Sequence, residues 1–384
     1  MSLKVRILDS PAALRGVSHA WDELWWRAEA SLPTLRAETA AQWSEHFASG
    51  RLAAVCIEHE GSFVAALPMV PLPFKRAIPA MGPASGVWSR CGDLLLDPQA
   101  DREAVCGLLL RALRTLRPLL MWCDAMAYEQ QAWASLRQAA VEQGWAHACI
   151  PQAAVGQLEL RREWGEYFSS RSKSHRRALR RAEKCAEQMG GVEVAWHEAP
   201  SPESAAELVR MGFEVEHRGW KGRCGGSVLS VPGLLSFFQR QARQLAEWGQ
   251  LRLVFLLHRG QPIAFEYAPC AKGVYHAVKV GYDEAWHALS PGQLLRYLAY
   301  PALFADPAMY RIDFSGPLTQ ATARWSTHAE PRGSLLFAHS LAGRAILAAY
   351  RALRPVLRRL RSAPPPETFE LPRSLNLPRS AHRN

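Results

Sequence analysis

Three acidic residues stand where a carboxylate could take part in chemistry. Glu266 interrupts the otherwise apolar run 262–268, whereas Asp283 and Asp313 lie at the ends of predicted strands. A carboxyl group buried in an apolar strand is a candidate general base, because burial favours the form that has taken up a proton. Alternatively, Glu266 lies at a sheet surface or pairs with Lys279 across the hairpin. The two aspartates could instead cap the segments that follow them.

A glycine-containing turn offers a different chemistry. The run Ser-Pro-Gly-Gln at 290–293 opens a helical pattern that extends to about residue 304. The first N–H groups of a helix have no acceptor within it, so this helix start could hold a phosphate or pyrophosphate group. Ser290 is not expected to be a nucleophile, because it lacks the G-x-S-x-G frame and the following Pro291 makes it a turn residue.

These residues lie in a stretch predicted to form a strand meander, a helix and a return strand. The predicted strands are 251–257, 262–268, 274–280 and 311–314, and the predicted helix is 293–304. Short apolar runs joined by a Gly-containing turn at 258–260 are typical of a β-hairpin. The helix and return strand would bring the turn at 290–293 and Asp313 close to the meander.

The order and spacing of several motifs between residues 158 and 337 resemble a known family. The motifs are Trp-Lys-Gly at 220–222, Gly-Tyr-Asp at 281–283, Ser-Pro-Gly-x-Leu-Leu at 290–295, Asp-Phe-x-Gly at 313–316 and Arg-Trp at 324–325. They are similar to the acetyltransferase domain of the BioF and cellulose-biosynthesis type in the GNAT superfamily. The same resemblance extends distantly to the Fem-type peptidyltransferases, which have tandem arrangements of such domains.

The resemblance implies an α/β (α+β) fold of tandem GNAT-like domains, each a mixed, mostly antiparallel sheet flanked by helices. It implies an acyltransferase that moves an acyl group from acyl-CoA, acetyl-CoA or longer, to a small-molecule or glycan-linked amine in envelope or polysaccharide biosynthesis. A Fem-type transferase that uses aminoacyl-tRNA is the alternative within enzymes. A non-catalytic module that binds an anionic partner is the alternative from another class.

Acyl transfer requires that the amine lose a proton and that the developing oxyanion be stabilised. We therefore expect Glu266 or Asp283 to be the catalytic base. Expected cofactor contacts are Val278, Lys279, Val280, Ser290, Pro291, Gly292, Gln293 and Leu294, and expected substrate contacts are Trp220, Lys221, Arg223, Tyr282, Asp313, Arg176 and Arg180. Lys221 and Arg223 lie in a glycine-rich segment that could grip an acidic group or be a solvated loop. His217, His276 and His287 are weaker candidates, because a lone histidine is more often structural.

Composition indicates a globular protein without a structural metal. The chain has 384 residues, of which 48% are hydrophobic, enough for two domains with cores of their own. Its 8 cysteines are spaced singly, which predicts a reducing compartment and no metal site. The sequence shows no apolar leader and no run of membrane-spanning length. We expect a cytoplasmic location, or a peripheral one at the inner face of a membrane.

The net charge of +11 is concentrated in residues 171–184 and 344–384. In the first segment the cations share one side of a predicted helix, which we call the basic face: Lys173, Arg176, Arg177, Arg180, Arg181 and Lys184. It is either a solvated surface or a site for cofactor phosphates, tRNA, acidic lipid or a carrier protein. The absence of interleaved aromatic residues argues against single-stranded nucleic acid, and no DNA binding is expected.

We expect residues 1–155 to form a degenerate GNAT-like domain and 156–341 the acyltransferase domain, followed by a basic amphipathic helix at 342–362 and a disordered tail at 363–384. The predicted hairpins at 52–65 and 251–264 align on Gly61 and Gly260, which indicates either a duplication or a chance likeness of short strands. Asp97 and Asp101 precede the helix of the first half. Because carboxylates there repel a phosphate, we expect the cofactor in the second half.

Overall fold

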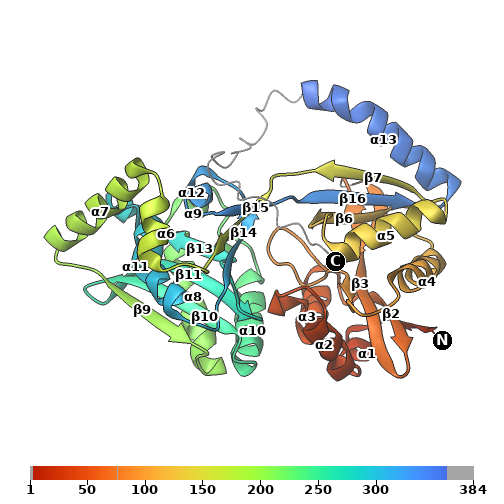
Figure 1. Ribbon diagram of the computed structural model, residues 1–384, viewed down its shortest axis with the longest axis horizontal. Helices are drawn as coiled ribbons and strands as arrows, with labels where there is room; N and C mark the ends of the chain where they lie inside the picture. The colour runs from red at the N-terminus through yellow and green to blue at the C-terminus, as the bar shows by residue number, and fades with distance from the viewer. Residues whose placement is uncertain (1–2, 76, 361–384) are drawn as a thin grey trace.

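A computed structural model describes residues 3–75 and 77–360 and contains an eight-stranded sheet in each half (Figure 1). The strands of the first sheet are β1 (Leu3–Leu8), β2 (Ala53–His59), β3 (Ser62–Phe74), β4 (Ile78–Pro83), β5 (Leu95–Leu96), β6 (Met121–Met126), β7 (Ala146–Pro151) and β16 (Gly333–Ala338). Its helices are α1 (Pro11–Arg15), α2 (Ser18–Arg27), α3 (Ala37–Phe47), α4 (Arg102–Thr115) and α5 (Gln131–Glu142), with the 3-10 turn η1 (Pro33–Leu35).

The second sheet contains β8 (Val155–Glu159), β9 (Glu193–Glu198), β10 (Leu251–His258), β11 (Gln261–Ala271), β12 (Val274–His276), β13 (Lys279–Tyr282), β14 (Arg311–Pro317) and β15 (His328–Glu330). Its helices are α6 (Trp164–Ser170), α7 (Lys173–Gln188), α8 (Pro202–His217), α9 (Trp220–Arg223), α10 (Leu234–Glu247), α11 (Pro291–Ala305) and α12 (Gln320–Ala323), with η2 (Val228–Ser230) and η3 (Glu284–Leu289). The expected meander, helix and return strand are confirmed, but the expected third strand is interrupted and forms β12 and β13.

The two sheets have corresponding strand orders. The first is β1-β2-β3-β4-β6-β16-β7 and the second, read from its far end, is β9-β10-β11-β12-β14-β8-β15. The pairing sense also agrees along both paths, because β4–β6 and β12–β14 are parallel and the other neighbours are antiparallel. This confirms the predicted α/β class with two mixed, mostly antiparallel sheets in tandem.

The hairpins that aligned in the sequence have the same local geometry. In each, two residues with positive φ form the turn: Glu60 (φ 49°) and Gly61 (φ 83°) in the first half, Arg259 (φ 48°) and Gly260 (φ 76°) in the second. Such turns match the right-handed twist of paired strands. Each hairpin also has an irregularity at the aligned position, between residues 57 and 58 and between residues 256 and 257. The shared turn and bulge support a duplication.

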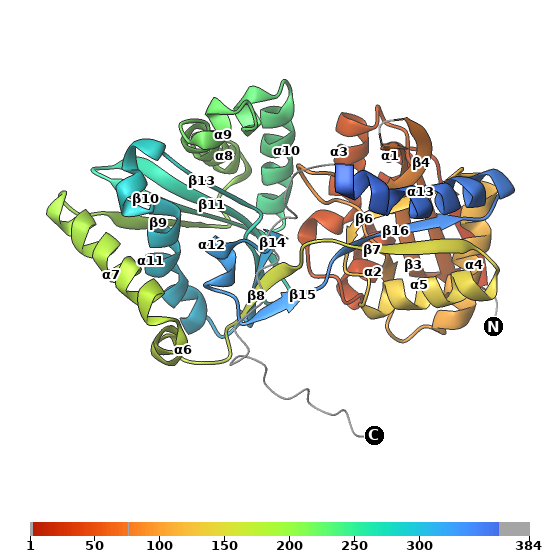
Figure 2. The same cartoon turned by 90° about the horizontal axis from the view of Figure 1, so that it is seen from above.

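One strand from the C-terminal part of the chain belongs to the first sheet. β16 lies between β6 and β7 and pairs antiparallel with both, whereas β8, which follows β7, pairs with β14 and β15 in the second sheet. This placement differs from the division expected from the sequence, which assigned residues 333–338 to the domain 156–341. The chain therefore passes between the halves twice, before β8 and after β15 (Figures 1 and 2).

A continuous hydrophobic cluster joins the two halves. Trp21 and Trp25 of α2 and Trp43 of α3 belong to the same buried cluster as Phe213 of α8 and Phe238 of α10. Figure 2 shows α10 beside α3 at this interface. Burial of large aromatic side chains contributes more stabilisation than any surface contact. We therefore expect the halves to behave as one unit.

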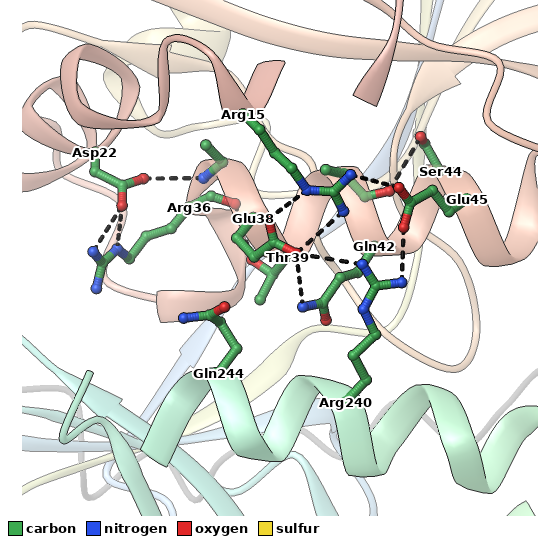
Figure 3. A network of polar contacts seen from close by, with 12 residues as sticks. Arg15, Asp22, Arg36, Glu38, Thr39, Gln42, Ser44, Glu45, Arg240 and Gln244 are labelled. Carbon is green, nitrogen blue, oxygen red and sulfur yellow. Dashed lines mark hydrogen bonds and ion pairs between the residues drawn. The ribbon is translucent and has the colours of Figure 1, made fainter. Parts of the chain in front are cut away.

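An ion-pair network borders the same interface (Figure 3). The Arg240 guanidinium of α10 lies 2.8 Å from Glu45 Oε2 and 3.5 Å from Glu38 Oε1, both on α3. Arg15 approaches the same two carboxylates at 2.6 Å each. These side chains are partly exposed, so each pair contributes little to stability. The network links α10 to α3 at the border of the hydrophobic cluster.

The last described helix, α13 (Leu341–Leu360), lies across the first sheet (Figure 1). Its residues Ile346, Leu347 and Tyr350 pack in a cluster with Phe74 and Leu336. The packing interpretation of this basic helix is thus the one observed, and the tail expected at 363–384 lies outside the described residues. No helix among residues 3–75 and 77–360 is long and apolar enough to cross a membrane.

Lys272, in the turn between β11 and β12, binds the first half through main-chain groups. Its Nζ donates to the carbonyl oxygens of Ala28 and Ala30, each at 2.8 Å, and to that of Trp25. The Nζ also lies 4.5 Å from the centroid of the Trp25 ring. The ammonium group satisfies three carbonyls at the end of α2 at once.

The Lys272→Met variant should lower the free energy of unfolding by about 2 kcal/mol, because it leaves partly buried carbonyl groups without a donor. Urea denaturation followed by tryptophan fluorescence measures this change. Lys4→Met, at an exposed position of β1, is the matched control and should change little. Equal stability of the two variants would contradict the role of Lys272.

Candidate functional site

The second sheet opens where β12 continues into β13. β12 pairs in parallel with β14, and the Ala277 N–H donates to Asp313 O at 2.8 Å. Beyond this point β13 pairs with β11, and its other edge has no strand partner in the described part of the chain. An open strand edge presents N–H and C=O groups that can bind an extended ligand.

The start of α11 lies against this open strand. Ser290 precedes the helix in a left-handed conformation (φ 47°, ψ 57°), Pro291 is the first helical residue, and no side chain caps the helix start. A Cβ atom on Gly292 would lie 3.8 Å from both Tyr282 Cδ1 and Val280 Cγ2. Four of the predicted residues, Ser290, Gly292, Val280 and Tyr282, are therefore brought together. Pro291 has no N–H group, and the N–H groups of Gln293 and Leu294 donate to Ser290 O at 2.8 and 3.1 Å, so among the described residues the Gly292 N–H is the one in this turn that is left for an anion.

The corresponding helix of the first half has a different start. Asp101 caps α4, and its Oδ1 accepts a hydrogen bond from the Ala104 N–H at 3.2 Å. A carboxylate at this position satisfies an amide of the first turn and repels a second anion. Of the two equivalent helices, α11 is the one with the open start.

Glu266 forms a buried ion pair that holds α11 on the sheet. Its Oε2 accepts from Arg296 Nε at 2.9 Å and lies 2.8 Å from Arg296 Nη2, while its Oε1 accepts from Tyr275 Oη at 3.0 Å and Tyr300 Oη at 3.1 Å. The Glu266 side chain is 2% exposed, which matters because a group without contact to a ligand cannot exchange a proton with it. These contacts are those of a structural ion pair, and the catalytic role of Glu266 stays a prediction.

Lys279 is not the partner of Glu266. Its Nζ lies 5.1 Å from the ring centroid of Trp88, which belongs to the first half, and 5.3 Å from that of Phe238. Burial lowers the pKa of Lys279 to about 8. Lys279 therefore points toward the interface between the halves, on the opposite face of the sheet from α11.

Asp283 has two structural contacts. Its Oδ2 lies 2.7 Å from Arg218 Nε, and its Oδ1 accepts from the Ala285 N–H at 3.0 Å, so it caps η3. Capping is the alternative that the sequence left open. Unlike Glu266, Asp283 is only partly buried, so a ligand beside β13 could reach it. Its role as a base also stays a prediction.

The Trp-Lys-Gly segment holds β13 in place. Lys221 Nζ lies 2.6 Å from Glu216 Oε1 and donates to Val280 O at 3.1 Å. A Cβ atom on Gly219 would lie 2.6 Å from Tyr282 O, and one on Gly222 would lie 1.8 Å from a main-chain oxygen of α8. Only glycine allows α9 to approach the strand and α8 so closely. The Lys221 ammonium group thus binds two groups of the protein itself, the Glu216 carboxylate and the Val280 carbonyl.

The neighbours of Lys221 face outward. Trp220 is 49% exposed, which makes it available to a ligand or a partner. Arg223 is exposed and its Nη2 donates to Glu284 Oε1 at 2.8 Å. Their predicted role in substrate binding stays a prediction.

Residues 173–325 match the acetyltransferase (GNAT) domain family. The match covers strands β9 to β14 of the opened sheet with α7, α9 and α11, whereas β8 and β15 lie outside it. We call this part of the chain the GNAT domain, after the family that it matches. No curated protein matches the chain significantly.

Several solved structures share the fold over most of the chain. FemX is 10% identical, with 88% of this chain and 98% of that chain covered and a TM-score of 0.58. A conserved protein of unknown function from Bacteroides thetaiotaomicron VPI-5482 is 10% identical (88% and 100% covered, TM-score 0.54). The C-terminal domain of a putative lysylphosphatidylglycerol synthetase from Agrobacterium fabrum is 9% identical (88% and 97% covered, TM-score 0.53). The predicted likeness to Fem-type proteins is confirmed as a likeness of fold.

The basic face of the GNAT domain lies on α7, which packs against α11 and η3. Leu179, Ala182 and Ala186 of α7 are buried against the domain. Arg180 lies 5.9 Å from the ring centroid of Phe168, and Arg176 Nε donates to a main-chain oxygen at 3.1 Å. Among the described residues, no cation of the basic face forms an ion pair, and all except the partly buried Arg176 are exposed. Uncompensated cations thus lie on the helix that packs against α11 and η3.

The remaining residues predicted to bind cofactor or substrate have contacts within the protein. Gln293 Oε1 accepts from Trp325 Nε1 at 2.7 Å, and Leu294 is buried in the core of the GNAT domain. Val278 packs on the cluster shared with the first half. Asp313 is buried and accepts from Gln157 Nε2 at 3.1 Å. Asp313 therefore faces the first half, whereas its neighbours along β14 face α11.

The sequence analysis missed the partners of Glu266. Arg296 and Tyr300 are four residues apart and therefore share one face of α11, and Tyr275 is on the neighbouring strand. A buried carboxylate needs such partners. Arg296 and Tyr300 are polar residues on the apolar face of the predicted helix, and this was the signal that could have identified them.

The Glu266→Gln variant should lower the free energy of unfolding by about 3–5 kcal/mol, because it leaves the Arg296 guanidinium buried without a carboxylate. Chemical denaturation measures the loss. The double variant Glu266→Gln/Arg296→Met removes both charges and should recover part of it. If Glu266 acts only as a base, the single variant would keep wild-type stability and lose turnover.

Proposed function

We propose that the protein is an acyltransferase that moves an acyl group from acyl-CoA to an amine, with the donor bound by the GNAT domain. The observation that carries the proposal is the meeting of the open edge of β13 with the uncapped start of α11 at Gly292. A nucleotide thioester has a polar chain that suits a strand edge and a pyrophosphate that suits a helix start.

The residues at this site fit acyl-CoA. The Gly292 N–H would donate to the pyrophosphate at the positive end of α11, and the main chain of residues 278–280 would hold the chain that carries the acyl group. The open space at Gly292, where a Cβ would make no close contact, leaves room for this approach. The basic face on the adjacent α7 would neutralise phosphate charge. When bound, the cofactor supplies a carbonyl group activated as a thioester.

The acceptor amine must lose a proton as its nitrogen attacks that carbonyl, and the C–S bond then breaks so that CoA leaves as a thiolate that takes up a proton. Asp283 is the more accessible of the two proposed bases, because Glu266 is enclosed by Arg296, Tyr275 and Tyr300. Proton loss to water at the open strand is the alternative. The likeness to the BioF and cellulose-biosynthesis type favours small or glycan-linked amines of envelope or polysaccharide assembly as acceptors.

A second candidate is a transferase that takes its donor from aminoacyl-tRNA. The observation that favours it is the row of cations along α7 from Lys173 to Lys184, which is exposed except at the partly buried Arg176. A polyanion would neutralise such a row along its length. Acidic lipid and an acidic carrier protein are further partners of this kind. A non-catalytic module would retain the basic face but would not bind acyl-CoA.

Acyl-CoA at a hundred times its dissociation constant should stabilise the protein by about 2.7 kcal/mol, measured as a thermal shift against a panel of acyl-CoA species. Gly292→Val should abolish this shift and keep the fold, because its side chain blocks the helix start. Gly165→Val is the matched control, since Gly165 lies in the first turn of α6 and a Cβ there meets no atom within 4 Å. Wild-type affinity of a folded Gly292→Val protein would refute the assignment.

Replacing Arg176, Arg177, Arg180 and Arg181 by Gln decides the role of the basic face. If it binds tRNA, wild-type affinity should fall steeply with rising salt, and the Gln variant should flatten that slope while retaining acetyl-CoA binding. If it binds cofactor phosphates, the Gln variant should bind acetyl-CoA more weakly. A variant with four lysines keeps the charge and serves as the control. Unchanged affinities for both ligands at low and high salt would indicate a solvated surface.

A further inference from the structure

A row of buried polar side chains crosses the second sheet on the face toward the first half. Gln157, Asp313 and His276 are neighbours on β8, β14 and β12. Gln157 Nε2 donates to Asp313 Oδ2, and His276 Nε2 lies 3.1 Å from Oγ of Ser31 in the first half. The row occupies the last paired position before β13 and β14 part. It therefore borders the proposed donor site from the side of the first half.

Arg90, from the connection between β4 and β5, adjoins this row without a carboxylate partner. Its Nη2 donates to Ala125 O at 3.0 Å, and no ion pair of Arg90 is found among residues 3–75 and 77–360. The side chain is partly buried, and burial together with the charge of Arg332 lowers the pKa of Arg90. A guanidinium removed from water without a counter-ion is costly. Its remaining N–H groups are therefore suited to an anion.

Two further arginines adjoin the row. Arg332, just before β16, is 8% exposed, so its charge is largely desolvated; it pairs with Glu330 through Nη2. The Nε atoms of Arg332 and Arg311 are buried without a hydrogen-bond partner in the described part of the chain. Arg311 is two residues from Asp313 on β14 and so lies on the same face of the sheet. Together with Arg90 these side chains provide several donors that the protein itself does not use.

The nearby carboxylates have partners other than Arg90. Asp313 accepts from the Ser315 N–H at 2.7 Å as well as from Gln157. Asp93 accepts from Trp133 Nε1 at 2.7 Å and from its neighbouring main-chain N–H at 2.8 Å. Burial lowers the pKa of His276 to about 4, so its ring is neutral near pH 7. The positive groups beside this row are therefore arginines: Arg332 pairs with Glu330, whereas Arg90 and Arg311 form no ion pair with a described carboxylate.

We propose that Arg90, together with Arg332, binds an oxyanion group of the acceptor, a carboxylate or a phosphate, between the two halves. The guanidinium group presents parallel N–H donors that match the oxygens of either group. The inference rests on the proposed acyl transfer, to which it adds the class of acceptor: an amine that also carries an anionic group. It also assigns acceptor binding to the first half, because Arg90 and Ser31 belong to that half, whereas the proposed donor site lies in the second.

The test is an anion titration with the donor site filled. The protein is saturated with CoA, and sodium phosphate or sodium succinate is added at constant ionic strength while the unfolding temperature is recorded. The wild type should be stabilised by at least one of the two salts, and the comparison shows whether phosphate or carboxylate is preferred. Arg90→Gln should weaken the apparent affinity about tenfold or more, since a charged hydrogen-bonding partner is lost.

Arg51→Gln is the matched control, because Arg51 is an exposed arginine of the first half that also donates to one main-chain carbonyl. Its anion affinity should equal that of the wild type. If Arg90→Gln does not fold, Arg90→Lys keeps the charge, removes the parallel donors and should still weaken binding severalfold. Equal anion affinity of the wild type and the Arg90 variant, or no stabilisation of the wild type by either salt, would overturn the inference. Absence of a shift with CoA would instead refute the proposed function, while a titration without CoA still decides the role of Arg90.

Discussion

The ion pair between Glu266 and Arg296 determines where α11 lies on the second sheet. Removing both charges from water costs free energy, which the protein offsets by giving each carboxylate oxygen two hydrogen-bonding contacts from Arg296, Tyr275 and Tyr300. An apolar contact would leave α11 free to slide or rotate, whereas this pair has one satisfactory geometry. Because the pair fixes the second turn of α11, the first turn faces β13 and Gly292 approaches Val280 and Tyr282. The open helix start is useful only in that position.

The strand beside the helix is fixed by equally specific contacts. Lys221 binds the Val280 carbonyl, and Gly219 lets α9 approach the main chain of Tyr282. Without such contacts a strand with one open edge would be free to shift toward β14 and close the sheet. On the β14 side, Asp313 accepts from the Ser315 N–H, and Ser315 has φ 54°, so β14 is irregular between its pairing with β8 at Asp313 and at Pro317. The strands β13 and β14 are thus held by separate sets of contacts.

Much of this arrangement follows from local patterns, and the rest does not. Alternation and turn residues predict the meander, and helical spacing predicts α11 and α7, because these patterns report which face of one element is buried. The interruption between β12 and β13 depends on β14, which is remote in the sequence, so the apolar run 274–280 looks like one strand. Glu266 was recognised as unusual, but its partner Arg296 is thirty residues away and became visible only in three dimensions. The place of β16 in the first sheet was hidden for the same reason, since an apolar strand suits either sheet.

The two halves share one fold but differ at the start of the corresponding helices α4 and α11. Their sheets have the same strand order and their hairpins the same turn, yet Asp101 closes the start of α4 while α11 remains uncapped. A capped helix start disfavours phosphate, so the first half is free to contribute in another way. Its segments around Ser31 and Arg90 lie against the polar row of the second sheet, and the aromatic cluster and Lys272 hold them there. A GNAT domain alone would lack these groups. Under the two proposals this is a physical reason for the tandem arrangement, because one half would present the start of α11 to the donor and the other would supply cations to the acceptor.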